Sequence, residues 1–400
     1  MTTAVKAKSS PSFAEFVTVL SLMMSLTALS IDSMLPALAA IGNELGVENA
    51  NDRQLVVTMI FLGLALGQMF FGPLSDRTGR KPAIYLGFAL YIVGSLIAVV
   101  AVEFPIMLLG RFVMGLGASS ARALTLALVR DRYEGRVMAR VMSFVMTVFI
   151  LVPIIAPSLG QAILLVADWR AIFMVLIVIA IVAWIWFALR IPETLHPEDR
   201  APFSISRIVY GLREIFKSRP ALGYTISAGL IGGAFLGYLS SAQQIFQEMY
   251  GLGEQFPIIF GVIAFSIGMA SFSNTRLVMR YGMHFLVIWS LRIITLLALI
   301  ALGVSLVTGG QPPLWFLMAY LLTSFFCVGI LFGNQNALAM EPLGHLAGIG
   351  AAVVGSLSTL IQMPLGTLIG QNYNGTVVPM ILGLALLSGL SLIVVRWAES

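Results

Sequence analysis

The sequence Gly-Pro-Leu-Ser-Asp-Arg-Thr-Gly-Arg-Lys occupies residues 72–81 and lies between two long apolar segments. Its glycines permit a tight turn where two helices meet closely. Asp76 supplies a carboxylate that accepts hydrogen bonds from a helix N-terminus or an arginine, and such a bond can form in one packing of the molecule and break in another. A cytoplasmic loop rich in basic residues is the simpler interpretation, but it leaves Asp76 and the glycines unexplained. We therefore predict a gating loop that contains Gly72, Asp76, Arg77, Gly79 and Arg80.

The composition places the rest of the chain in a lipid bilayer. Of its 400 residues, 59% are hydrophobic and only 10% are charged, whereas soluble domains have about 25% charged residues. A helix needs about 20 apolar residues to cross a bilayer, and these apolar runs are long and do not alternate as barrel strands do. We predict twelve membrane helices, over residues 13–42, 53–74, 83–102, 105–129, 137–166, 169–189, 220–248, 256–279, 284–307, 312–340, 346–371 and 376–396.

One long polar stretch divides the chain. It spans residues 190–219, so we predict a six-helix bundle over 1–189, a cytoplasmic linker over 190–219 and a second six-helix bundle over 220–400. Within the linker, residues 203–216 have the pattern of a short amphipathic surface helix. The two halves resemble each other, since both contain Arg-x-Gly between their second and third helices and proline within their fifth. Paired halves with interrupted helices indicate a transporter whose site lies between them near the midplane.

Lysine and arginine set the topology. If the N-terminus is cytoplasmic, 18 of the 23 basic residues fall in cytoplasmic segments and only Arg53 and Arg170 fall in outside loops. The positive-inside rule then places both termini in the cytoplasm. This bias also accounts for the net charge of +5, so we expect no nucleic-acid partner. Of the three arginines within helices, Arg122 is expected to reach the cytoplasmic surface from the inner end of its helix, and Arg292 has no assigned role.

Residues 72–81 resemble the signature loop of the major facilitator superfamily, Gly-x-Leu-x-Asp-Arg-x-Gly-Arg-Lys. The arrangement of two times six helices extends this resemblance over the whole chain. The resemblance implies an all-α integral membrane protein with twelve helices in two pseudo-symmetric bundles. It further implies alternating access, a monomer, and no cofactor or metal.

Asp32 and Arg111 are the candidate proton-coupling residues. An acidic residue within a membrane helix is functional unless it reaches water, and loss of hydration favours the protonated carboxyl group. Asp32 lies past the midpoint of the first helix, so a helix cap at the outer surface is its alternative role. Arg111 begins the pattern Arg-x-x-x-Gly-x-Gly-Ala, which resembles the helix-four motif of drug:proton antiporters, where the arginine takes part in proton transfer. Snorkelling to the outer surface is the alternative for Arg111.

Helix five contains a second motif, Val-Pro-Ile-Ile-Ala-Pro-Ser-Leu-Gly-Gln, at residues 152–161. It is similar to the antiporter signature Gly-x-x-x-Gly-Pro-x-x-Gly-Gly, although Val, Ala and Gln replace three of its glycines. The variant Pro-x-x-Ala-Pro resembles the bicyclomycin/chloramphenicol resistance (Bcr/CflA) exporters, as do several short segments in order along the chain. A kinked packing helix remains the alternative. A second acid in helix one, found in some broad-range drug exporters, is absent, which argues against strongly cationic substrates. The motif residues are Pro153, Pro157 and Gly160.

The resemblance implies a cavity lined by helices one, four, seven and ten. Mostly apolar walls with a few polar groups suit small amphipathic ligands. Each polar residue is at least as easily explained by a hydrogen bond between helices. The candidates for the substrate cavity are Asp32, Tyr238, Gln243, Asn334, Asn336 and Gln362.

These features predict a proton-coupled exporter of small amphipathic molecules or drugs in the bacterial inner membrane, with substrate, protons and lipid as its partners. The sequence contains no Walker loop, His-Glu-x-x-His motif or cysteine pair, so we expect no enzyme activity. An exporter of a natural metabolite such as a sugar, an amino acid or a siderophore is the alternative in the same fold. A non-transporting membrane sensor and a channel are less well supported.

Overall fold

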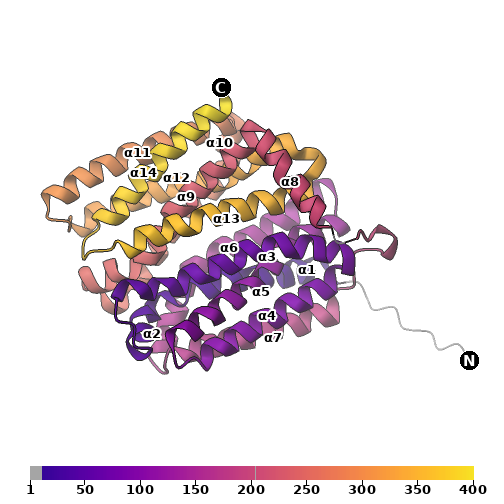
Figure 1. Cartoon of the computed structure of the whole chain (residues 1–400), viewed down its shortest axis with the longest axis horizontal. Helices are drawn as coiled ribbons and strands as arrows, with labels where there is room; N and C mark the ends of the chain where they lie inside the picture. The colour runs from indigo at the N-terminus through magenta and orange to yellow at the C-terminus, as the bar shows by residue number, and fades with distance from the viewer. Residues whose placement is uncertain (1–10, 203) are drawn as a thin grey trace, which may run out of the picture.

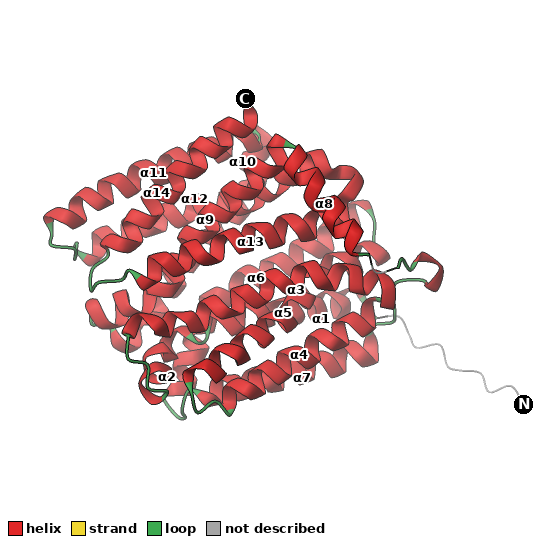
Figure 2. Cartoon of the chain, in the orientation of Figure 1, coloured by secondary structure: helices red, strands yellow, loops and turns green. Residues whose placement is uncertain are grey.

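The computed structural model describes residues 11–202 and 204–400. These residues form helices, turns and loops without any strand (Figure 2). Twelve spans among them are long and apolar enough to cross a membrane. The first six and the last six form two groups that lie side by side with their helices roughly aligned (Figure 1). The prediction of an all-α membrane protein with twelve spanning helices is confirmed.

The first group of spans ends at Arg190. Its α-helices are α1 (Phe13–Asp32), α2 (Leu38–Glu44), α3 (Leu55–Thr78), α4 (Arg80–Val99), α5 (Phe104–Arg132), α6 (Gly135–Leu164) and α7 (Arg170–Arg190). Two short 3-10 helices join them, η1 (Leu35–Ala37) and η2 (Ala50–Gln54).

The second group begins at Arg219. Its α-helices are α9 (Arg219–Gln243), α10 (Phe256–Tyr281), α11 (Met283–Val307), α12 (Leu314–Met340), α13 (Ala347–Gln371) and α14 (Val378–Glu399). Short segments extend or join them: the π-helix η4 (Gln244–Met249) and the 3-10 helices η5 (Gly253–Gln255) and η6 (Glu341–Leu346).

Between the groups, the linker contains η3 (Pro197–Asp199) and α8 (Ile205–Lys217). The predicted short helix in the linker is therefore confirmed. Its apolar side, with Ile215 fully buried, packs on α13, and Gly211 lies against Ile349 of that helix. α8 crosses the ends of the spans on the side of the molecule where the linker lies (Figure 1). We call this side the inner end and the opposite side the outer end.

The first membrane span is interrupted, although we predicted one apolar segment over 13–42. α1 ends at Asp32, and the chain passes through η1 before α2 begins at Leu38. Pro36 explains the break, because its nitrogen has no hydrogen to donate to the carbonyl group of Asp32 four residues earlier. The interruption leaves Asp32 at the very end of a helix inside the first bundle.

Small residues bring α5 close to its two neighbours. A Cβ atom at Gly63 of α3 would lie 2.2 Å from the carbonyl oxygen of Phe112, and one at Gly94 of α4 would lie 2.3 Å from the nitrogen of Met114. Such distances leave no room for any side chain, so glycine is required for this packing. Close backbone contact of this kind is a common source of helix association in lipid.

The halves share the turn between their second and third spans. Gly79 follows α3 with φ +101° and ψ 162°, and Gly282 follows α10 with φ +80° and ψ 159°. Both values lie in a region that favours glycine. The internal similarity noted in the sequence therefore corresponds to the same backbone conformation at the same place in each half.

Candidate functional site

Asp32 lies in the interior of the first bundle, at the C-terminal end of α1. Its side chain is 5% exposed. It forms no hydrogen bond or ion pair with any residue that the structure describes. A buried carboxylate without a partner is costly in a membrane. The alternative role at the outer surface does not fit this burial.

Arg111 ties three helices of the first bundle together. Its Nε donates to the carbonyl oxygen of Val56 at 2.9 Å, and its Nη2 donates to the carbonyl oxygen of Ser30 at 2.7 Å. The guanidinium also lies over the ring of Phe173. The side chain is 0% exposed, so it does not snorkel to the surface. Arg111 holds the backbone two residues before Asp32 and does not pair with the carboxylate itself.

Two polar residues beside this arginine were missed by the sequence analysis. Tyr91 of α4 is buried, and its hydroxyl lies 2.7 Å from the hydroxyl of Ser30. The same tyrosine packs against Gly117 of α5. The available signal was that Tyr91 falls in the middle of the apolar stretch 86–94 of α4, but tyrosine is also enriched at membrane interfaces.

The helix-five motif lies next to the break that follows α1. Pro153, Pro157 and Gly160 all fall within α6, which continues through both prolines. Gly160 packs against the backbone of Ser33. The motif therefore contacts and positions the backbone of the residue that follows Asp32. The second half packs against the same helix at Ile154, which lies against Gly261 of α10.

Tyr238 approaches Asp32 from the second half. It is 1% exposed, its hydroxyl has no hydrogen-bond partner among the described residues, and it lies close enough to Asp32 for the carboxylate charge to act on it. Its ring stacks on Phe260 and contacts Phe325, with ring centroids 5.9 and 4.6 Å away. Two polar groups that no described residue satisfies therefore lie beside a buried cluster of aromatic rings.

The other residues predicted for the cavity do not gather at this place. Gln243, the last residue of α9, donates to Glu248 at the outer end. Asn334 of α12 pairs with Asn274 of α10 towards the inner end, and the exposed Asn336 bonds back to the carbonyl oxygen of Phe332. Gln362 of α13 lies against Gly232 of α9. Of the six predicted residues, Tyr238 is the one that an electrostatic interaction links to Asp32.

At the outer end, polar contacts join the two halves. Asn51 donates to the carbonyl oxygens of Gln371 and Tyr373 at 2.9 and 2.8 Å, and Gln371 donates back to the carbonyl oxygen of Asn51. Gln244 bonds to both Asn51 and Gln54. We call the set Asn51, Arg53, Gln54, Gln244, Glu248, Gln371 and Tyr373 the outer seal, since Arg53 also pairs with Glu248 at 3.4 Å.

Towards the inner end, far fewer polar contacts join the halves. Ser356 of α13 donates to the carbonyl oxygen of Ala65 in α3 at 2.5 Å. Beyond this level the hydrogen bonds and ion pairs between described residues stay within one half or its linker. The structure therefore has its outer end closed by hydrogen bonds and its inner end less tightly joined.

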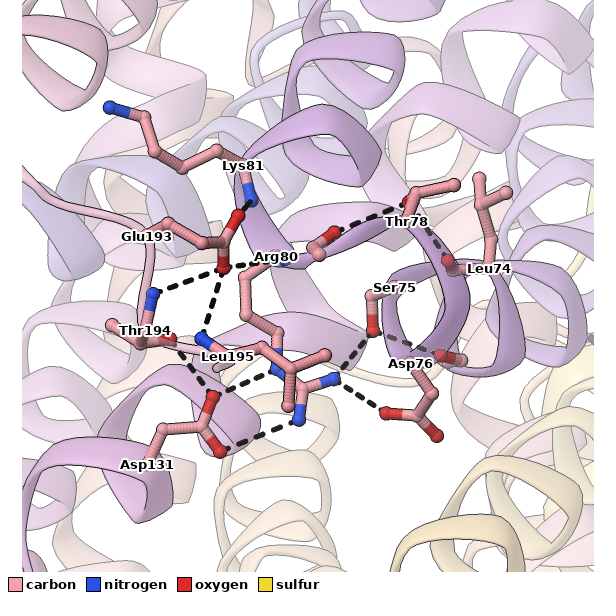
Figure 3. A network of polar contacts seen from close by, with 12 residues as sticks. Leu74, Ser75, Asp76, Thr78, Arg80, Lys81, Asp131, Glu193, Thr194 and Leu195 are labelled. Atoms are coloured by element: carbon pink, nitrogen blue, oxygen red, sulfur yellow. Dashed lines mark hydrogen bonds and ion pairs between the residues drawn. The ribbon is translucent and has the colours of Figure 1, made fainter. Parts of the chain in front are cut away.

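The predicted gating loop forms a charge network within the first half (Figure 3). The buried guanidinium of Arg80 contacts Asp76 at 2.6 Å, Asp131 at 2.8 Å and the hydroxyl of Ser75 at 2.8 Å. Asp131 lies in the last turn of α5, so the network joins the second, third and fourth spans. Arg77 in the same loop is exposed and has no partner among the described residues.

Glu193 connects this network to the linker. Its carboxylate accepts hydrogen bonds from the backbone N–H groups of Arg80, Lys81, Thr194 and Leu195 at 2.8 to 3.1 Å. Two of these donors begin α4, where a carboxylate is stabilised by the helix dipole (Figure 3). Glu193 was missed as a site residue because it lies more than a hundred residues from the loop it caps.

Comparison with protein-family models identifies the family of this chain. The model of the Major Facilitator Superfamily matches residues 20–366. The chain belongs to the Major Facilitator Superfamily. It is a multi-pass membrane transporter of that superfamily with twelve spans.

Relatives and solved structures agree with the superfamily. An uncharacterised MFS-type transporter of Bacillus subtilis, YdgK, is 33% identical over 90% of this chain and 89% of its own length. A bicyclomycin resistance protein homologue of Haemophilus influenzae is 28% identical, covering 92% of this chain and 91% of its own. The xylose transporter XylE of E. coli superposes with a TM-score of 0.72 over 95% of this chain and 96% of its own, at 12% identity, which shows a shared fold.

Proposed function

We propose that this superfamily member is a proton-coupled exporter of small amphipathic molecules, including drugs, from the bacterial cytoplasm. The name of the Haemophilus relative supports drug export. The observation that carries the coupling proposal is the buried Asp32 carboxyl group, which no described residue of the protein satisfies. A carboxyl group in this state can either bind a proton or accept a hydrogen bond from a substrate, so proton and substrate compete for it.

Alternating access would use the two halves as the moving units, divided as residues 1–189 and 220–400. The outer seal opens to admit a proton from outside, and the proton reaches Asp32 at the break after α1. Arg111 keeps the carbonyl of Ser30 in place during this step, so it orients the end of α1 and makes no direct ion pair with Asp32. Tyr238 of the second half then meets substrate and Asp32 from the opposite side.

The gating loop would govern the inner end. With both termini in the cytoplasm, the network of Asp76 and Arg80 lies at the cytoplasmic surface. In the present arrangement its contacts stay within the first half and the linker. We propose that in the opposite arrangement this loop also contacts the second half and holds the cytoplasmic side closed.

Substrate-driven proton release tests the proposal. The purified chain is reconstituted in proteoliposomes with a pH-sensitive dye inside, and chloramphenicol or bicyclomycin is added. We expect proton movement that depends on the drug and is lost in Asp32→Asn. Glu48→Gln, which removes a carboxylate from the surface at the outer end, serves as the matched control and should behave as the unaltered chain. Drug transport with full proton flux in Asp32→Asn would refute coupling at Asp32.

A further inference from the structure

Arg122 lies deeper in the membrane than its sequence position suggested. We expected it near the inner end of its helix, but α5 continues for ten residues beyond it, to Arg132. At 1.5 Å per residue this places Arg122 about 15 Å from the inner end of the helix. A helix of 29 residues is longer than the bilayer core, so Arg122 falls within the hydrocarbon region.

The face of α5 that carries Arg122 is the face turned to the interior of the protein. Arg111 lies eleven residues earlier and Ala118 four residues earlier, and these spacings put all three on one side of a helix. Arg111 bonds to the backbones of α1 and α3, and the carbonyl oxygen of Ala118 accepts a hydrogen bond from Thr27 of α1 at 3.3 Å. Arg122 therefore does not lie on the lipid-facing side of α5.

On this interior face, Arg122 is exposed and unpaired. Its side chain is exposed, and it has no hydrogen bond, ion pair or ring contact with any described residue. The outer seal joins the two halves at the other end of the molecule, so a ligand in the space in front of Arg122 would enter from the inner end. A guanidinium facing such a space keeps its charge only if the space holds water or a ligand.

The second half also has an exposed polar residue in the inner part of its fourth span. Asn336 of α12 is also exposed, and it lies one turn after Phe332, whose ring contacts Phe235 of α9. Gly333 on the same side is exposed as well. The inner halves of the fourth and tenth spans thus present an exposed cation and an exposed amide. Among the residues that the structure describes, Asp32 is the only acidic side chain deep within a span, and it lies nearer the outer end.

We propose that Arg122 binds an anionic group, a carboxylate, on substrates that enter from the cytoplasm. This rests on the proposed export function and adds a class of substrate to it. The planar guanidinium offers two parallel donors that match the two oxygens of a carboxylate. An amphipathic acid would place its carboxylate on Arg122.

Binding of matched acids and esters tests the proposal. Nalidixic acid and its methyl ester are measured by equilibrium dialysis against the full chain in nanodiscs, at a pH where the acid is ionised. We expect the unaltered chain to bind the acid more tightly than the ester. In Arg122→Gln the affinity for the acid should fall about tenfold or more while that for the ester stays the same, and Arg122→Lys should recover part of the loss.

Arg292→Gln is the matched control. Arg292 is a second exposed arginine within a span, but it lies over the ring of Trp289 in α11 and has no part in the proposed site. Its replacement should leave both affinities unchanged. Equal binding of acid and ester by the unaltered chain, or equal weakening of both by Arg122→Gln, would overturn the proposal. The proposal would also be overturned if Arg122→Gln changed acid binding in chloride buffer but not in gluconate buffer, because the ligand of Arg122 would then be an inorganic anion.

The same variants separate this inference from the export function. Chloramphenicol has no carboxylate, so its proton-coupled transport should persist in Arg122→Gln proteoliposomes. If the unaltered chain prefers acids but shows no drug-driven proton flux, the export proposal is refuted and the binding role of Arg122 stands. A proton leak in Arg122→Gln without any change in acid binding would mean that the charge acts as a barrier, and the binding role would be rejected.

Discussion

Gly160 of α6 lies directly against the carbonyl oxygen of Ser33, the residue after Asp32. A Cβ atom at position 160 would lie 2.0 Å from that oxygen. The fifth span therefore meets the chain at the break in the first span, where the backbone of Asp32 loses its regular helical bonding. The helix-five motif and the membrane carboxylate, predicted separately, belong to one structural unit.

Gly160→Ala should damage this unit. The added methyl group has no space and must displace the backbone at Ser33, at a cost of about 1–3 kcal/mol. We expect a lower unfolding temperature in detergent and a drug-driven proton flux reduced at least severalfold. Gly303→Ala, at a glycine of α11 where an added Cβ atom would meet nothing within 4 Å, is the control and should be neutral. Normal flux in Gly160→Ala would show that the break tolerates displacement.

Asn51→Ala should weaken the outer seal. The side chain of Asn51 forms three hydrogen bonds to the second half, two as donor and one as acceptor from Gln244. Each hydrogen bond contributes about 1 kcal/mol, so the closed state should lose at least about tenfold in relative population. A cysteine at the buried Ser240 of α9, in a Cys327→Ser background, would report the opening by its reaction with an impermeant maleimide.

The control for the seal is Thr308→Ala. Thr308 lies at the outer end but bonds only within its own helix end, so its loss should not change labelling at position 240. Equal labelling of the Asn51→Ala and unaltered backgrounds would mean that the remaining seal residues hold the outer end closed without Asn51.

Arg80→Ala should be far more harmful than Arg77→Ala, although the two arginines are three residues apart. Removal of Arg80 leaves Asp131, whose side chain is 12% exposed, without its cation, at a cost of about 3 kcal/mol. The pair with Asp76 contributes less, because that carboxylate is 43% exposed. Thermal unfolding in detergent measures both variants. Similar unfolding temperatures for Arg80→Ala and Arg77→Ala would exclude a structural role for the network.

Tyr238→Phe should separate binding from folding. The hydroxyl of Tyr238 has no partner among the described residues, so its removal should not lower the unfolding temperature. We expect weaker binding of chloramphenicol, by about fivefold to tenfold, if the hydroxyl bonds to substrate. Tyr320→Phe removes another buried, unsatisfied hydroxyl of the second half and is the control. Loss of affinity in both variants alike would point to a general packing effect.

The spans and the linker could be predicted from sequence because each depends on local composition. A run of about 20 apolar residues has no stable alternative to a membrane helix in lipid. The short helix at 205–217 was predicted for a similar reason, since its apolar residues recur at the helical period. Residue identities within 72–81 and 152–161 also sufficed to locate the loop and the motif.

What the sequence did not show depends on contacts between distant segments. Nothing local to Glu193 indicates that it caps α4, and nothing local to Arg111 indicates that it bonds to backbone carbonyls instead of Asp32. The predicted cavity residues were chosen by polarity, and polarity does not distinguish Tyr238, which approaches Asp32, from Gln243, which bonds to Glu248 of the outer seal. The fourth span was predicted to end at residue 129, whereas α5 continues to Arg132.

The turns at Gly79 and Gly282 have one backbone shape and different side chains around it. Asp76 and Arg80, which pair across the first turn, correspond by position to Met279 and Met283 around the second. If an ancestral unit was duplicated, its two copies kept the peptide geometry that joins the helices and diverged in charge. The two halves thus share a backbone framework, but only the first turn carries the ion pair. Equivalent mutations at the two turns should therefore differ in their effect on stability.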